Sequence, residues 1–133
     1  MSLDVWIGRP TKTGRGLAVS FEPESYYWFL YSLFEEFAQS HGQMIDLYGG
    51  ALFEPGELEP VLALVGRAET LVEAQGEQFD VHVETNLGSA LEPRNEEIHG
   101  KVTRAEYLAF LRKLRAAVLE AQRLGKPLVF FGD

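Results

Sequence analysis

Two histidines and a carboxylate are the residues of this chain whose types and spacing come nearest to a metal site. His82 and Glu84 lie two positions apart in an alternating segment, so on a β-strand they point to the same side. His99 would join them if residues 79–86 and 97–102 pair as a hairpin. Such a set can bind zinc and leave a position for water. The alternative is an ordinary solvent-facing polar row. We favour that alternative and expect neither a metal nor a cofactor.

A second group of polar residues stands beside a pair of glycines. Asp46 and Tyr48 precede Gly49 and Gly50, and a carboxylate with a phenol could bind a small ligand there. The glycines match no phosphate-binding loop, because neither GKS/T nor G-x-G-x-x-G occurs. The alternative, which we favour, is a tight bend in which both glycines take positive φ angles.

Acid–base and nucleophilic chemistry find little support in the chain. Glu35, Glu36, Asp46 and Glu54 could supply paired carboxylates for proton transfer, but nothing in their spacing brings them together. The chain has no cysteine, which excludes thiolate nucleophiles and thiolate metal sites. None of the serines stands in a nucleophile elbow. These features favour a protein that is not an enzyme.

The aromatic segment 21–37 contains the position with the strongest binding character. At about 100° per residue, residues 23–40 form a helix with one broad apolar face. Trp28 falls on the opposite face, with Tyr31 at the boundary and Glu35 nearby. A Trp–Tyr pair rimmed by carboxylates has the composition of a binding hot spot. The alternative is that a loop covers Trp28 as satellite core. The predicted binding residues are Trp28, Tyr31, Glu35, Asp46 and Tyr48.

The other segments predict the elements that position these residues. Residues 44–53 fit either a short strand or an ordered loop. Further strands are predicted over 3–7, 17–21, 78–86, 97–102 and 128–131, and further helices over 54–76 and 103–125. Hairpins and crossovers both occur in this order. We therefore expect one α+β domain over residues 1–133, a two-layer sandwich with three helices on one face of a mixed or antiparallel sheet of about five or six strands.

Several residues predict where these elements end and how they are placed. Thr103 and Glu106 match the capping box at the start of the last helix. Gly42 and Gly125 are placed to stop helices. The wholly apolar strand 128–131 is expected at the centre of the sheet, because at an edge it would invite pairing with other chains.

The charge distribution limits the class of partner. The net charge of −8 argues against nucleic acid and against an anionic membrane surface. Residues 101–126 hold seven Lys or Arg against two Glu, whereas the remainder holds five against eighteen acids. One interpretation is a solvated basic helix; the other is an acidic surface that steers a basic partner. No apolar run reaches the length of a membrane span, and no secretion signal is recognisable, so a cytoplasmic protein is expected.

Four segments carry a resemblance to known proteins: LDVWIG at the start, YYWFLYSLFEEF, IDLYGGALF and the terminal VFFGD. With these, the chain resembles small bacterial α+β proteins of uncharacterised type. In size, acidity, lack of cysteine and aromatic surface it is also similar to immunity proteins of bacterial toxin systems. That resemblance implies a protein partner but assigns no functional residue.

The leading hypothesis is therefore a non-enzymatic protein-binding domain of the immunity type, which neutralises a basic toxin domain or a similar partner. Acidic groups would speed the encounter, and buried aromatic side chains would hold the complex. A second hypothesis is a small enzyme or ligand-binding domain. A third is a homo-oligomeric structural module, a dimer for example, joined through the outer face of the first helix.

Overall fold

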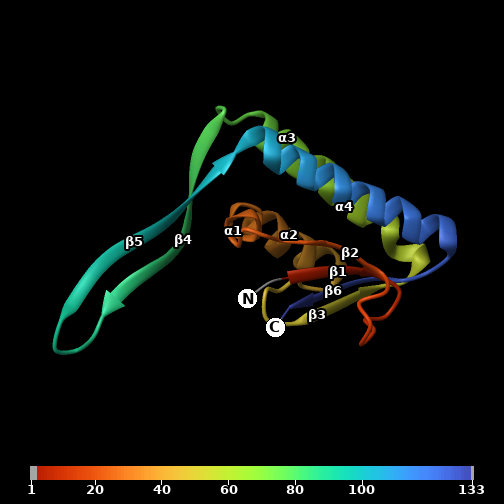
Figure 1. Ribbon diagram of the computed structural model, residues 1–133, viewed down its shortest axis with the longest axis horizontal. Coiled ribbons are helices and arrows are strands. Elements are labelled where there is room, and N and C mark those ends of the chain that lie inside the picture. Colours follow the sequence, from red (N-terminus) through yellow and green to blue (C-terminus); the bar gives the residue numbers. More distant parts are fainter. Residues whose placement is uncertain (1–2, 133) are drawn as a thin grey trace.

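The computed structural model describes residues 3–132, with the backbone alone for residues 84–86 and 94. It consists of a body, in which helices pack on a four-stranded sheet, and a long hairpin that projects from this body (Figure 1). Each pair of neighbouring strands in the body is antiparallel. In spatial order the strands are β2 (Leu17–Ser20), β1 (Leu3–Ile7), β6 (Leu128–Gly132) and β3 (Gly50–Phe53).

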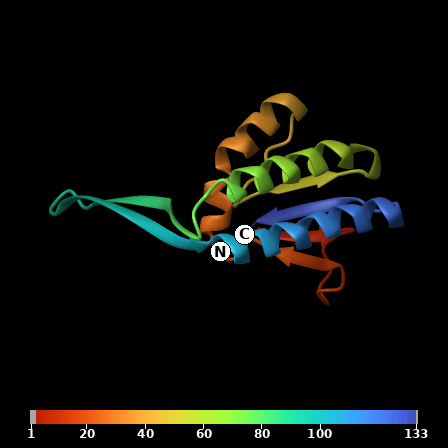
Figure 2. The same cartoon turned by 90° about the horizontal axis from the view of Figure 1, so that it is seen from above.

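The helices lie on one side of the sheet, so the α+β class and the two-layer arrangement are as predicted (Figures 1 and 2). They are α1 (Ser25–Phe29), α2 (Tyr31–His41), α3 (Leu58–Glu73) and α4 (Arg104–Leu124), with a 3₁₀ turn, η1 (Pro55–Glu57), before α3. Alternate residues of β1 and β6 enter the core between the layers. Leu3, Val5 and Phe130 are almost fully buried there against helix residues such as Phe34 and Leu111.

The apolar strand β6 lies between β1 and β3, as its composition predicted. Leu128 and Phe130 face the helices, whereas Val129 lies on the far side of the sheet opposite Trp6 of β1. Trp6 and Val129 are buried on that side, but the neighbouring Phe131 is 50% exposed. The uncovered face of the sheet is therefore partly apolar.

The single helix predicted over 23–40 is wrong, because the chain turns at Leu30 and forms α1 and α2. Leu30 has φ −97° and ψ 3°, outside the helical region, and is itself buried. Helix α1 contacts the projecting hairpin and α2 contacts α3. A straight helix could not place its aromatic residues against both, and burial of those residues outweighs the loss of helical regularity.

Two helices end at the predicted glycines, whereas α3 ends earlier than predicted. Gly42 and Gly125 follow α2 and α4 with φ angles of 78° and 65°, the left-handed conformation that glycine adopts readily. Helix α3 stops at Glu73 with Ala74 as its cap, ahead of the predicted Gly76.

The capping box predicted at Thr103 is wrong, because no side chain caps α4. The backbone N–H of Arg104 donates to the carbonyl of Glu77 at 2.9 Å, and the Arg104 Nη1 donates to the carbonyl of Gln75 at 2.7 Å. The chain that leaves α3 therefore binds the start of α4. A capping box forms instead at η1, between Glu54 and Glu57.

The projecting hairpin, called the arm below, consists of β4 (Gln78–Gly88), β5 (Pro93–Thr103) and the turn between them. These strands pair with each other and form a separate two-stranded sheet (Figure 1). A hairpin was expected here, but over fewer residues and within a single sheet. The six described strands are thus divided four and two. At about 3.3 Å per residue, each 11-residue strand of the arm spans roughly 36 Å.

The edge strand β3 is closed by a side chain. The Nε2 of Gln43 donates to the carbonyl of Leu52 at 2.7 Å, and the backbone N–H of Leu52 donates to the Oε1 of Gln43 at 3.2 Å. The amide thus makes the two bonds that a neighbouring strand would make. Edge strands left open invite pairing with other chains, so Gln43 protects β3 from such pairing.

We predict that Gln43→Ala lowers the free energy of unfolding by about 1–2 kcal/mol, because two partly buried hydrogen bonds are lost. Urea denaturation measures this change. Gln39→Ala is the matched control, since Gln39 is an exposed residue of α2. Equal stability of the two variants would show that the Gln43 amide does not support β3.

Candidate binding surfaces

Four of the five predicted binding residues lie around one buried phenol, that of Tyr27. The rings of Trp28 and Tyr31 lie 5.1 Å and 6.0 Å from the ring of Tyr27, centroid to centroid, and 5.4 Å from each other. The Tyr27 hydroxyl donates to the carbonyl of Ile45 at 2.9 Å. The structure therefore brings the end of α1, the start of α2 and the segment after α2 together.

The carboxylates of this group act on the ionisation of Tyr27. Burial raises the pKa of Tyr27 far above its ordinary value, and the charge of Asp46 raises it further. Tyr31 and Glu35 add smaller contributions in the same direction. Tyr27 therefore stays a neutral hydrogen-bond donor, and its hydroxyl is used in holding the fold.

The helical position of Trp28 predicted a side chain that points away from the core, and this prediction is wrong. Its side chain is partly buried and packs against the hydrophobic core. Its indole Nε1 is buried and has no hydrogen-bond partner among the described residues. The break at Leu30 explains the difference, because it turns α1 relative to the helix from which the position of Trp28 was inferred. The interpretation of Trp28 as satellite core is the one that the geometry supports.

Asp46 and Tyr48 form a turn. The backbone N–H of Tyr48 donates to the Oδ1 of Asp46 at 3.0 Å, and that of Gly49 donates to the Asp46 carbonyl at 3.3 Å. The expected positive φ angles of Gly49 and Gly50 are wrong, since neither glycine has one. Gly50 instead begins β3. Asp46 thus supports a turn by an aspartate-to-backbone bond, and the Tyr48 side chain is 57% exposed beside it.

His82 faces His99 across the arm, with ring centroids 5.5 Å apart. A bulge follows His82, so that the backbone of Glu84 pairs with that of Ile98. The side chain of Glu84 lies outside the described residues. Glu97 contacts His99, at 3.4 Å between Oε2 and Nε2.

The described residues contain no group of three or more His, Cys, Asp or Glu side chains that could hold a metal ion. The histidine pair supplies two ligands, whereas a zinc site built by a protein has three or four.

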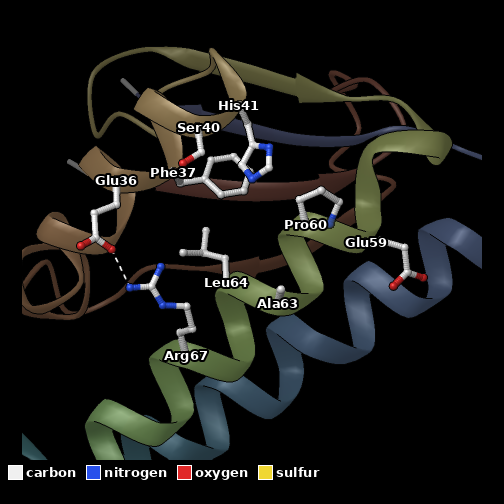
Figure 3. A pocket seen from close by; sticks show the side chains of 9 residues that line it. All are labelled: Glu36, Phe37, Ser40, His41, Glu59, Pro60, Ala63, Leu64 and Arg67. Atoms are coloured by element: carbon white, nitrogen blue, oxygen red, sulfur yellow. Dashed lines mark hydrogen bonds and ion pairs between the residues drawn. The ribbon is translucent and has the colours of Figure 1, made fainter.

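A groove of about 420 Å³ lies between α2 and α3, and Figure 3 shows the side chains that line it. Glu36 of α2 and Arg67 of α3 are joined across one end at 2.5 Å. Ser40, His41 and Glu59 also line it. His41 packs on the ring of Phe37 at 4.5 Å between centroids, and Glu59 accepts a bond from Gln122.

The groove continues along the outer side of α3. A second hollow of about 440 Å³ shares Ala63 and Arg67 with the first and is lined mainly by apolar atoms, including those of Leu33 and Leu71.

The arm is the surface that sequence reasoning missed. Its root is buried: Val81 and Val102 are within the core, and the Phe79 ring lies 5.0 Å from that of Phe29. Farther out, exposure rises to 36% at Ile98, 68% at Leu87 and 94% at Leu91. The segment NLGSALEP, in which leucines stand among turn residues, was the available signal.

A close backbone contact seats the root of the arm on α1. A Cβ at Gly100 would stand 2.9 Å from the Cβ of Ser25, closer than real carbon contacts allow. Only glycine lets β5 approach α1 this closely. The arm therefore leaves the body in a defined direction.

We predict that Trp28→Ala lowers the free energy of unfolding by about 2 kcal/mol, less than the loss at a fully buried tryptophan. Chemical denaturation measures the loss. Tyr48→Ala is the control, because the Tyr48 side chain is mostly exposed. A stable Trp28→Ala protein would return Trp28 to the surface that the sequence predicted for it.

Alkaline pH should unfold the protein through its buried tyrosines. Burial raises the pKa of Tyr107 and Tyr27 above the ordinary value of 10.0. The unfolded chain therefore ionises first, and stability that is complete below pH 10.0 falls as the pH rises beyond it. The free energy of unfolding in urea, compared between neutral pH and about pH 11, measures this loss. Tyr107→Phe should reduce it; an unchanged pH dependence would contradict the assignment.

Among the described residues, no helix is both long enough and apolar enough to cross a membrane. In comparisons with known proteins, no family model, no curated protein and no solved structure matches the chain. The function therefore has to be argued from the surfaces described above.

Proposed function

We propose that the chain is a non-enzymatic protein-binding domain that holds its partner with the β4–β5 arm. The observation that carries this proposal is the projection of the arm from the body (Figure 1), together with the exposure of the large apolar side chains Leu87 and Leu91 toward its tip. A two-stranded hairpin alone is at best marginally stable in water. Its exposed leucines gain nothing from the body, so a partner is the means of burying them.

The chemistry of the arm defines the surface that it fits. Leu87 and Leu91 would fill an apolar depression at the centre of the contact. Glu92, Glu96 and Glu97 are exposed around them. The partner surface is therefore apolar with a basic rim, and the acidic groups accelerate the encounter.

An inhibitory role of the immunity type agrees with this surface. A toxin domain that acts on nucleic acid has a basic active surface, because it must bind phosphates. An acidic arm with an apolar tip would occupy such a surface and block access to it. The acidity of the whole chain supports this proposal.

The body has a supporting role in the proposed complex. Trp28 and Tyr27 hold α1, and α1 carries the root of the arm. The predicted binding residues Tyr31 and Glu35 lie on α2, where they would contact a partner that reaches past the root. Their contribution to binding remains a proposal.

We predict that Leu87→Ser combined with Leu91→Ser abolishes capture of the partner and leaves the melting temperature unchanged, because both side chains are exposed. The tagged chain serves as bait in lysate from its own source, and mass spectrometry identifies the captured protein. Leu17→Ser is the matched control, since Leu17 is an exposed leucine of β2, away from the candidate surfaces. Capture of one stoichiometric partner by both arm variant and wild type would refute the role of the arm.

A further inference from the structure

We infer that a second copy of this chain is a partner of the arm, and that each arm of the dimer lies along the outer face of the other copy's α4. This inference rests on the proposed function, since it assigns the occupant of the same binding element. Three independent properties of α4 support it: its charge, its exposed leucines and its length and direction.

The outer face of α4 presents a row with an apolar centre and basic ends. Arg112, Ala116, Leu119 and Arg123 are exposed and recur at the spacing that places residues on one side of a helix. Arg123 is also paired with Glu120 of its own helix, so among the described residues Arg112 is the member of the row that carries an uncompensated positive charge there. Leu119 is 48% exposed, and Leu124 at the end of the helix is 44% exposed. This is the surface that the arm requires, apolar with a basic rim.

The charges of the two elements are equal and opposite. Residues 78–103 hold five acids and two bases, a net charge of −3. Helix α4, residues 104–124, holds five bases and two acids, a net charge of +3. The chain as a whole is acidic, so α4 is a localised exception. Complementary charge of this kind favours an arm on α4 over an arm on another acidic surface.

The two elements match in length. The 11 residues of each arm strand span roughly 36 Å at about 3.3 Å per residue. The 21 residues of α4 span roughly 32 Å at about 1.5 Å per residue. An arm laid along α4 would therefore cover the whole helix.

The directions of the arm and of α4 exclude a contact between these two elements within one copy. Strand β5 runs directly into α4 at Thr103 and Arg104, and the arm and α4 diverge from this junction at a wide angle (Figures 1 and 2). The arm therefore extends away from its own basic helix. It would have to fold back on its root to reach that helix, and the contact of Gly100 with Ser25 holds the root in place.

A two-fold axis beside the junction satisfies both arms at once. The axis exchanges the directions of the arm and α4, so each arm lies along the partner's α4 from its start to its end. The tip, with Leu87 and Leu91, reaches the C-terminal end of that helix, where Leu124 is exposed. Glu96 and Glu97, which lie nearer the root, come between Arg112 and Arg123. The interface is closed and self-complementary, which limits the assembly to a dimer.

Sedimentation equilibrium of the full chain, over a wide range of protein concentration, tests the inference. The expected mass is twice the monomer mass of 14.9 kDa. Arg112→Glu with Arg123→Glu should raise the dimer dissociation constant at least about tenfold, because four attractions between the copies become repulsions. Lys113→Glu with Lys126→Glu is the matched control, since it makes the same charge change outside the row. Melting temperatures confirm that the variants fold.

A charge exchange makes the test specific for an arm on α4. The helix variant should recover dimerisation when mixed with an arm variant that carries Glu96→Arg and Glu97→Arg, whereas neither variant alone should dimerise well. Recovery would establish the contact between these two elements. A dimer that all variants leave unchanged would overturn the inference, because its interface would lie elsewhere.

The failure of this inference and that of the proposed function are distinguishable. If the chain is monomeric at all concentrations but loses a captured partner on substitution of Leu87 and Leu91, the dimer is refuted and the binding role of the arm is retained. A chain in which those substitutions change neither the mass nor the capture overturns both.

Discussion

The stacking of Tyr107 on Tyr26 is the contact on which the positions of α1 and the arm depend. The two rings are 4.2 Å apart and nearly parallel, and the Tyr107 hydroxyl donates to the backbone carbonyl of Tyr26 at 2.5 Å. Tyr107 is fully buried in the first turns of α4. The rings of Phe29 and Phe79 lie 5.8 Å and 6.4 Å from it, so one side chain joins α1, α4 and β4. Without Tyr107, the root of the arm would lose the ring against which Phe79 and α1 pack. The loss of stability would exceed that of the buried area alone, since aromatic pairs add to the free energy of folding beyond their buried area.

This contact separates the arm into a fixed root and a presented tip. At the root, Val81 and Val102 extend the core into the hairpin, and Gly100 allows it to rest on α1. Exposure then rises along the strands until Leu91 is almost completely in solvent. The burial of the root and the exposure of the tip are therefore related. A two-stranded hairpin alone is at best marginally stable, and only the root of this one packs against the body, so its outer half is the part that the fold stabilises least.

The elements whose evidence is local could be predicted from the sequence. The apolar run 128–131 identified the central strand, and Gly42 and Gly125 marked helix ends, because a left-handed residue ends a helix whatever surrounds it. Helix α4 was clear from its apolar period. The break at Leu30 was not predictable, since aromatic residues on both sides of 23–40 satisfy one helix as well as two. Only the directions of α3 and the arm decide between them.

The errors at the candidate sites have the same origin. The bulge after His82 depends on the register with β5, which alternation along one strand does not reveal. Trp28 was assigned to a surface from the axis of a helix that does not exist in that form. Asp46 and Tyr48 were correctly recognised as neighbours of a bend, but the bend is made by the Asp46 side chain rather than by positive φ at the glycines.

The division of charge between the arm and α4 follows from this architecture. The two elements are consecutive in the chain and of opposite net charge. Tyr107 and Gly100 hold the junction so that they diverge, and the charges of the arm and of α4 do not meet within one copy. Leucines and acidic side chains are thus exposed on the arm, and Leu119, Leu124 and Arg112 are exposed on α4, whose Arg115 and Arg123 are paired with Glu69 and Glu120. The packing at one junction therefore accounts for the separation of the two surfaces.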